Sequence, residues 1–399
     1  MNILLKVFLV DILAKLVVMT STILLIRNMS DTHYSTYTIF MACTNIFSQI
    51  AIGSFSKMYI VDYSYLKNKK STLLLFEIIL AVFIAIVFVF IQPVVRSNVS
   101  ALLLLMVSTT LFSFIRVLFQ QQCNFKIFTL LEIIRVTLFA VLLLGSVYML
   151  RYKLSAINVI AFYTASLCFP LLFLCPKYLG LNLFSKIDCR YVLKYMLVKE
   201  QMYLFIYSTL MAVLLQIDVL TLKIWSTDYN VSTYSSALKY YYMMLLPLNT
   251  INSVLLPQIS FEDDYPKIQK VFKQQDKLSL IVLAGIIFSI IIAPYVLPII
   301  DGGKYPGSIN VFRVLSLSAI LSFWGSPYNN LLIKEREYGS LCMRFFIGII
   351  LAILGNYILI PKLGVDGTAV VTLLTYGLVN ISSRIHAKLI IKRKINEAF

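Results

Sequence analysis

Charged residues are scarce in this chain of 399 residues, and acidic residues are scarcer than basic ones. Only 13% of the residues are charged, whereas 60% are hydrophobic and the mean hydropathy is +0.86. An ordinary soluble domain carries about 25% charged residues, so this composition excludes that class. The sequence therefore predicts a polytopic membrane protein.

Residues that hold metals or perform catalysis are few and scattered. The two histidines, His33 and His386, are expected on opposite sides of the membrane, and the 6 cysteines show no C-x-x-C spacing. The sequence contains no H-E-x-x-H motif, nucleophile elbow or P-loop. We therefore expect no catalytic residue, no metal site, no cofactor and no disulfide framework.

Long apolar runs dominate the sequence instead. A helix of about 20 apolar residues crosses a bilayer. Such runs fall at 3–26, 37–60, 72–95, 99–120, 127–150, 154–175, 201–225, 234–258, 279–300, 309–333, 340–360 and 366–390. The first run is too long for a cleavable signal peptide and is expected to be retained. We predict an all-α integral membrane protein with about twelve transmembrane helices.

The net charge of +17 follows from the loops between these runs. With a cytoplasmic N-terminus, most basic loop residues flank the cytoplasmic side, including the two longer loops at 176–199 and 261–277. The opposite side holds only Arg27, Arg96, Arg151, Lys153, Lys304 and Lys362. This positive-inside bias places both termini in the cytoplasm. It also removes the need for a nucleic-acid partner, and we predict none.

A short motif recurs in the two halves of the chain. Asp31-x-x-x-Ser35-Thr36-Tyr37 returns as Asp228-x-x-x-Ser232-Thr233-Tyr234, each time between the first and second helix of a half. We predict an N-terminal six-helix lobe at 1–176, a cytoplasmic linker at 177–200 and a C-terminal six-helix lobe at 201–399, related as parallel repeats. The alternative is that both copies are polar turns with a Ser/Thr N-cap.

The runs at 201–225 and 234–258 contain charged residues. A charge near the centre of a membrane helix costs roughly 2.5–3.5 kcal/mol on insertion scales, so Asp218, Lys223 and Lys239 are expected to face an interior or a water-filled cavity. Asp218 needs a partner on another helix or access to water, and Lys239 is the candidate partner. A structural ion pair and a ligand-facing pair are both open at this point.

Further charges lie in the first half. Asp11 and Lys15 are spaced i, i+4 and can pair on one helix face, either as a neutralised pair or as part of a cavity wall. Arg116, Glu132 and Arg135 cluster near the helix ends, where they either snorkel to the interface or join a polar path.

Cations outnumber carboxylates within the predicted spans, and Arg313, Arg344 and Arg384 add to them in the second half. Arginine stays charged and binds phosphate oxygens in a bidentate manner. The excess favours an anionic passenger. Because the outer loops are short, any activity must take place within the helices.

The second half also carries family-like segments between about residues 200 and 390. These are Gln216-Ile217-Asp218, Ser235-Ser236-Ala237-Leu238-Lys239-Tyr240, Leu255-Leu256-Pro257-Gln258-Ile259-Ser260 and the stretch from Gly355 to Ala369. In combination they resemble the polysaccharide transporters of the MATE-like MOP flippase superfamily, which include the O-antigen repeat-unit flippases.

The resemblance implies two pseudo-symmetric six-helix lobes around a central cavity. It further implies transfer of undecaprenyl-diphosphate-linked oligosaccharide repeat units from the cytoplasmic to the periplasmic leaflet of a bacterial inner membrane, for O-antigen, lipopolysaccharide or another surface polysaccharide. The expected partners are this lipid-linked oligosaccharide, the bilayer, a proton or sodium ion, and other polysaccharide-assembly membrane proteins. Asp218, Lys239 and Arg313 match family positions.

These considerations give two sets of candidate residues. A cationic lumen that attracts the diphosphate is expected from Lys239, Arg313, Arg116 and Lys15. Ion coupling or structural pairing is expected from Asp218 and Asp11. One alternative is a cation-coupled multidrug exporter of the same superfamily, which would favour deep acidic residues. Another is a membrane-embedded polysaccharide polymerase or acyltransferase, which would show a large outer loop or an intramembrane histidine.

Overall fold

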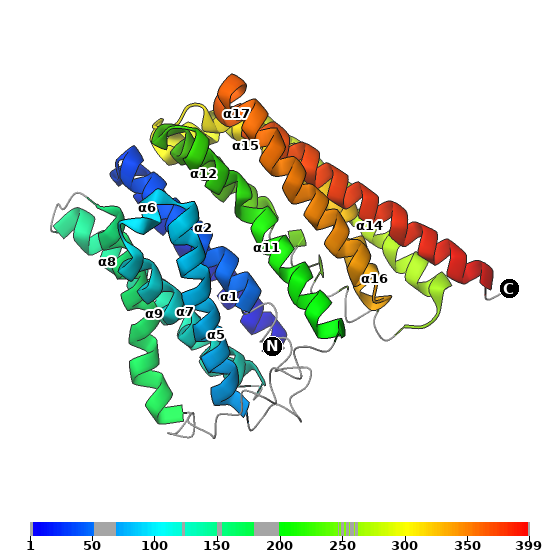
Figure 1. The fold of residues 1–399 in the computed structure, drawn as a ribbon, viewed down its shortest axis with the longest axis horizontal. Helices are drawn as coiled ribbons and strands as arrows, with labels where there is room; N and C mark the ends of the chain where they lie inside the picture. Colours follow the sequence, from blue (N-terminus) through cyan, green and yellow to red (C-terminus); the bar gives the residue numbers. More distant parts are fainter. Residues whose placement is uncertain are drawn as a thin grey trace. The chain divides into compact units, whose positions relative to one another are not determined.

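The computed structural model describes residues 3–51, 69–121, 124–149, 154–178, 199–245, 247–248, 251–252, 255, 259 and 262–397 (Figure 1). Within these residues the chain is almost entirely helical, and its one β-bridge joins Met29 to Leu154. Each of the twelve predicted runs has a helical counterpart among them. The all-α prediction is therefore confirmed.

The chain divides into two compact units, Met1–Ala212 and Val213–Phe399. The boundary lies inside a helix, α11, which spans Lys199–Trp225. The lobes at 1–176 and 201–399 and the linker at 177–200 stay predictions.

In the first unit, α7 packs against α2, α5 and α9, while α8 packs against α1 and α9. Buried apolar side chains such as Leu102, Leu105 and Leu131 fill these contacts. The elements are α1 Ile3–Asn28, α2 Asp31–Ala51, α5 Lys70–Ile91, α6 Pro93–Arg96, α7 Val99–Gln121, α8 Phe125–Leu144, the π-helical turn Gly145–Met149 and α9 Ala156–Tyr178.

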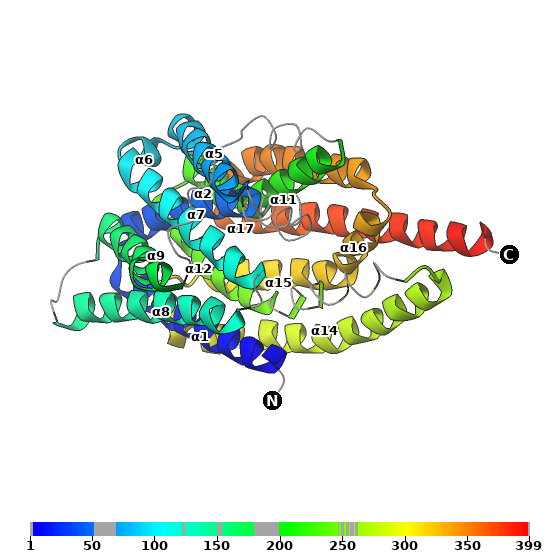
Figure 2. The same cartoon turned by 90° about the horizontal axis from the view of Figure 1, so that it is seen from below.

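In the second unit, α15 packs against α12, α14 and α17. Figure 2 shows α15 between α14 and α17. The elements after α11 are α12 Asp228–Met244, α14 Tyr265–Asp301, α15 Ser308–Gly325, α16 Pro327–Lys334 and α17 Tyr338–Glu397.

Helix α17 consists of two arms joined at Gly364, which has φ 57° and ψ −131° (Figure 1). This positive φ is readily reached by glycine and only rarely by other residues. The arms pack closely: a Cβ on Gly355 would lie 2.9 Å from the side chain of Val371, and one on Gly367 would lie 2.6 Å from the carbonyl oxygen of Leu359. The hairpin therefore brings residues of the first arm, such as Gly355, directly beside residues of the second arm, such as Val371.

We expect Gly367→Ala to destabilise this hairpin. The added methyl group would overlap a backbone carbonyl, which cannot rotate away, and overpacking of this kind costs typically about 1–3 kcal/mol. The matched control is Gly339→Ala on the same helix, because a Cβ there would meet no atom within 4 Å. Thermal unfolding in detergent should give a lower midpoint for the first variant only. Equal midpoints would contradict the close packing.

Two differences between the observed and the predicted boundaries change the interpretation of the sequence. Helix α14 begins at Tyr265 rather than at 279, so most of the predicted loop at 261–277 is helical. Pro266 at the second helical position favours this start, and Ile268 and Phe272 are buried on one face while lysines occupy the other. The run predicted at 309–333 is broken after Gly325, where Pro327 begins α16.

The two copies of the recurring motif share their local structure. Asp31 is the first residue of α2, and Asp228 is the first residue of α12. The side chain of Thr227 accepts a hydrogen bond from the backbone N–H of Asn230, and Ser30 does the same for His33. Each copy therefore begins a helix behind a hydroxyl N-cap, as both interpretations of the motif allow.

Candidate functional site

A buried carboxylate, Asp218, is the centre of the main polar cluster of the second unit. The residue is 5% exposed and lies seven residues before the end of α11. Its Oδ2 accepts hydrogen bonds from Thr372 Oγ1 at 2.8 Å and Tyr234 Oη at 3.1 Å, and its Oδ1 accepts one from Asn356 Nδ2 at 3.2 Å. Three donors thus hold the carboxylate in one orientation.

The donors come from three separate helical segments. Tyr234 lies on α12, Asn356 on the first arm of α17 and Thr372 on its second arm. Gly355 and Val371, which pack together across the two arms, directly precede the two donors on α17. The close approach at glycine therefore brings an amide and a hydroxyl to the same carboxylate.

All three donors are uncharged. Neither an arginine nor a lysine of the described chain forms an ion pair with Asp218, so the expected Asp218–Lys239 pair is not among the contacts of this carboxylate. A buried carboxylate without a countercharge is costly unless a proton or a cation neutralises it. The cluster is therefore suited to binding a small cation.

A second buried carboxylate, Asp301, lies at the end of α14 and is 2% exposed. Ser236 Oγ donates to its Oδ2 at 2.8 Å, and Tyr240 Oη donates to its Oδ1. These donors are one turn apart on α12. Asp301 lies just beyond the apolar run predicted at 279–300, and its donors come from α12, the helix that also supplies Tyr234.

The predicted cations of the second unit lie on helices α12 and α15. Lys239 is half-buried on α12 and makes no hydrogen bond or ion pair with any residue that the structure describes. Arg313 is half-buried on α15, and its Nε donates to the carbonyl oxygen of Ile290 at 3.5 Å.

Arg116 belongs to the first unit, where it shares one carboxylate with a second arginine. Its Nη1 lies 3.0 Å from Glu132 Oε2, and Arg135 binds both oxygens of Glu132. Arg135 also donates to Tyr163 Oη at 3.2 Å, and the Arg116 guanidinium lies 4.3 Å from the centroid of the Phe128 ring. This cluster links α7, α8 and α9 and keeps a net positive charge.

The remaining predicted site residues, Asp11 and Lys15, lie on α1. Their side chains are outside the described part of the structure. In the parts of the chain that are described, no three His, Cys, Asp or Glu side chains gather in a group that could hold a metal ion.

Sequence reasoning identified Asp218 but missed its partners. Tyr234, Asn356 and Thr372 are uncharged, so placing them in a membrane helix costs less than placing a charge there. The cost of insertion therefore did not single them out as site residues. Asn356 and Tyr234 did lie inside segments singled out for other reasons. The available signal was Asn356, a single amide inside the apolar run predicted at 340–360.

Comparison with known proteins shows the fold. The chain matches no protein-family model and no curated protein. It is similar to solved structures of an inward-facing multidrug resistance MATE family transporter of the MOP superfamily, with a TM-score of 0.71, 13% identity and coverage of 96% of both chains. It is also similar to the lipid II flippase MurJ in an inward closed conformation, with a TM-score of 0.76, 11% identity and coverage of 96% of this chain and 87% of that chain.

A further similar structure is a MOP superfamily transporter from Pyrococcus furiosus, described as having a binding pocket of reversed polarity. Its TM-score is 0.62 at 14% identity, with coverage of 98% of this chain and 94% of that chain. The protein therefore has the MATE-like fold of MOP superfamily transporters. This confirms the predicted fold class, an all-α membrane transporter fold.

Proposed function

Since the chain has the fold shared by the MATE transporters and the lipid II flippase MurJ, we propose that it moves a lipid-linked oligosaccharide across the membrane. The proposed substrate is an undecaprenyl-diphosphate-linked repeat unit, carried from the cytoplasmic to the periplasmic leaflet of a bacterial inner membrane for O-antigen or another surface polysaccharide. Two six-helix lobes, 1–176 and 201–399, would enclose the path, with both termini in the cytoplasm.

The observation that carries this proposal is the ammonium group of Lys239. It lies on α12, a helix whose buried residues include Ser232, Thr233, Ser235 and Ser236, so this helix is too polar to face lipid. A half-buried ammonium in a membrane needs an anion or water, and no described residue supplies the anion. The diphosphate of a lipid-linked sugar provides it.

Arg313 and the Arg116–Glu132–Arg135 cluster add further cationic groups that favour an anionic passenger. Both carry positive charge on membrane helices, and arginine binds phosphate oxygens in a bidentate manner. We assign Asp218 to the coupling ion, a proton or sodium, because a carboxylate held only by neutral donors gains most from a bound cation.

The runner-up function is a cation-coupled multidrug exporter of the same superfamily. Asp218 is the observation that favours it, because a buried carboxylate without a countercharge also suits an organic cation. Lys239 opposes it, because an ammonium group on the transport path would repel such a substrate. A membrane-embedded polymerase or acyltransferase has no residue cluster in its favour among those described.

The test is transfer of a fluorescent undecaprenyl-diphosphate oligosaccharide in proteoliposomes, measured by its access to a membrane-impermeant quencher. We expect Lys239→Gln to slow transfer by about tenfold or more, because hydrogen bonds to charged groups contribute about 1.5–3 kcal/mol. Lys270→Gln, an exposed lysine of α14, should transfer at the native rate.

The same vesicles distinguish the runner-up. If the protein exports organic cations, efflux of ethidium should be measurable in the native protein and faster in Lys239→Gln, because a repulsive charge has been removed. Native lipid transfer that is unchanged in Lys239→Gln would contradict the role assigned to this lysine.

A further inference from the structure

At the basic end of the second unit, α14, α16 and α17 surround a cavity of about 530 Å³ that is separate from the Asp218 cluster. The lining includes Lys273, Lys388 and Lys392, together with the rings of Phe272 and Tyr328. Along the second arm of α17, Lys388 is sixteen residues from Thr372, which corresponds to about 24 Å. The cavity is therefore distinct from the Asp218 cluster.

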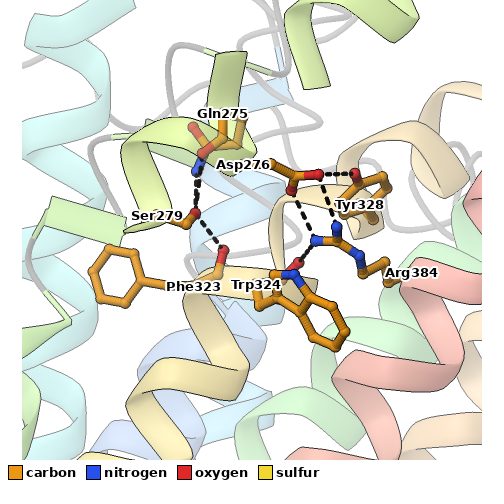
Figure 3. A network of polar contacts seen from close by, with 7 residues as sticks. All are labelled: Gln275, Asp276, Ser279, Phe323, Trp324, Tyr328 and Arg384. Atoms are coloured by element: carbon orange, nitrogen blue, oxygen red, sulfur yellow. Dashed lines mark hydrogen bonds and ion pairs between the residues drawn. The ribbon is translucent and has the colours of Figure 1, made fainter. Parts of the chain in front are cut away.

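Asp276 is the one carboxylate among the described residues that line the cavity, and it is already neutralised (Figure 3). Arg384 binds it through two parallel hydrogen bonds, from Nη1 to Oδ1 at 2.8 Å and from Nη2 to Oδ2 at 2.7 Å. Tyr328 Oη adds a third hydrogen bond at 3.2 Å. This bidentate pair lies at the base of the cavity and occupies both oxygens of Asp276, so this carboxylate does not neutralise the cavity lysines.

The Arg384 guanidinium also contacts a backbone carbonyl oxygen and two aromatic rings. Its Nη1 also donates to the carbonyl oxygen of Trp324 at 2.6 Å, near the end of α15. The central carbon of the guanidinium, Cζ, lies 4.1 Å from the centroid of the Trp324 ring and 4.8 Å from the centroid of the Tyr328 ring. The Tyr328 ring in turn stacks on Phe272, with centroids 4.5 Å apart. The cavity thus has a preformed aromatic and ionic floor.

The lysines above this floor are exposed and uncompensated. Among the described residues, Lys273 and Lys392 form no ion pair or hydrogen bond, and Lys388 has a ring contact at 6.0 Å from the centroid of Tyr328. Three positive charges therefore converge on one cavity whose rim also holds the amides of Gln269 and Asn396. Lysine binds phosphate as a point charge, and amides suit hydroxyl groups.

The position of the cavity favours a lipid as the source of the phosphate. On α14 the large apolar side chains Leu278 and Ile281 are 50% and 71% exposed, and on α17 Ile385 and Leu389 are 55% and 60% exposed. These residues follow or precede the cavity lysines by one or two turns. Basic pockets at such a boundary between apolar and basic surface bind anionic head groups.

We propose that this cavity, lined by Lys273, Lys388 and Lys392, binds the head group of an anionic phospholipid such as phosphatidylglycerol, with its acyl chains along the exposed apolar faces of α14 and α17. The phosphate contacts the three ammonium groups. The glycerol hydroxyls contact Gln269 and Asn396. The bound lipid is a resident of the second unit and not the transported substrate.

The experiment measures retention of phosphatidylglycerol by the full chain in phosphatidylcholine nanodiscs, using native mass spectrometry. The test variant replaces the cavity lysines: Lys273→Gln, Lys388→Gln and Lys392→Gln. The matched control replaces three exposed lysines of the same helices that do not line the cavity: Lys270→Gln, Lys277→Gln and Lys394→Gln. Both variants lose the same charge, and all six side chains are exposed, so both should fold.

We expect the dissociation constant for phosphatidylglycerol to rise about tenfold more in the cavity variant than in the control. Equal losses in both variants would overturn the proposal, because they would reveal diffuse attraction to a basic surface. Glycerol 3-phosphate, a soluble compound with the same phosphate and glycerol groups, is added as a competitor. We expect it not to displace the lipid, and full displacement at comparable concentration would overturn the lipid as the source. Neither result depends on whether the protein transports oligosaccharides.

Discussion

Replacing Asp218 by asparagine is expected to abolish the response of transport to an imposed proton or sodium gradient while the protein stays folded. Asparagine keeps an oxygen that can accept from Asn356. Its amide nitrogen would face Tyr234 Oη and Thr372 Oγ1, hydroxyls that can turn and accept. The hydrogen bonds therefore survive, but the negative charge that would bind the cation does not.

The measurement is the initial rate of lipid-linked oligosaccharide transfer with and without the gradient. In the native protein the gradient should accelerate transfer about tenfold or more, whereas Asp218→Asn should give one rate under both conditions. Asp301→Asn is the comparison variant, because Asp301 is a second buried carboxylate held by hydroxyl groups on α12. A gradient response that persists in Asp218→Asn and vanishes in Asp301→Asn would move the coupling site to Asp301.

Asp218→Ala separates the structural role from the coupling role. Alanine would remove the acceptor that Asn356, Tyr234 and Thr372 share. Asn356 keeps Thr221 Oγ1 and Thr372 keeps the Thr368 carbonyl oxygen, both at 2.9 Å, but one N–H of Asn356 loses its acceptor, and an unsatisfied buried donor costs about 1–3 kcal/mol. We expect this variant to express poorly or to unfold at a lower temperature. The contrast between alanine and asparagine at one position thus distinguishes loss of fold from loss of charge.

Arg384→Met is expected to give the largest loss of stability in the second unit. The substitution keeps much of the apolar volume but leaves Asp276 without its partner and the Trp324 carbonyl without a donor. It also removes the cation from the faces of Trp324 and Tyr328. Removal of one partner from a buried ion pair costs about 3–5 kcal/mol, and the partial exposure of Asp276 places the expected value at the lower end.

The check is the midpoint of thermal unfolding in detergent, with Arg393→Met as control. Arg393 lies on the same helix and pairs with Glu397, but its side chain is 80% exposed. Surface pairs of this kind contribute little, so the control midpoint should be nearly unchanged. The double variant Arg384→Met with Asp276→Leu should regain part of the lost stability. A midpoint for Arg384→Met equal to that of the control would show that the buried pair is not stabilising.

The fold could be predicted because apolar run length is the main determinant of a membrane helix. The runs at 340–360 and 366–390, for example, are the two arms of α17, and the glycine between them is the residue that reverses the chain. The start of α14 was missed for a physical reason. Its first turns carry several lysines, and an apolar-run criterion stops there, although Ile268 and Phe272 continue the buried face.

The missed first turns of α14 also affected the predicted excess of cations over carboxylates within the membrane helices. Arg384 had been counted as a surplus cation in the membrane, but its partner, Asp276, lies on the part of α14 that had been assigned to a loop. The structure pairs the two residues. The surplus of cations is therefore smaller than the sequence suggests. In the second unit it rests on Lys239, Arg313 and Arg344, whose Nη2 lies 2.7 Å from His386 Nδ1.

The Asp218 cluster could be predicted only in part. A carboxylate in a long apolar run is conspicuous because its insertion is costly. Which groups meet it depends on contacts between segments far apart in the chain, such as the packing of Gly355 against Val371. No spacing rule within one helix contains that information.

Two of the polar contacts that hold the second arm of α17 reach carboxylates on other helices. Thr372 donates to a carboxylate on α11, and Arg384, twelve residues and about 18 Å further along, grips a carboxylate on α14. A helix held at two separate levels can neither rotate freely about its axis nor slide freely along it. Both contacts would have to break before this arm could rotate or slide relative to α11 and α14.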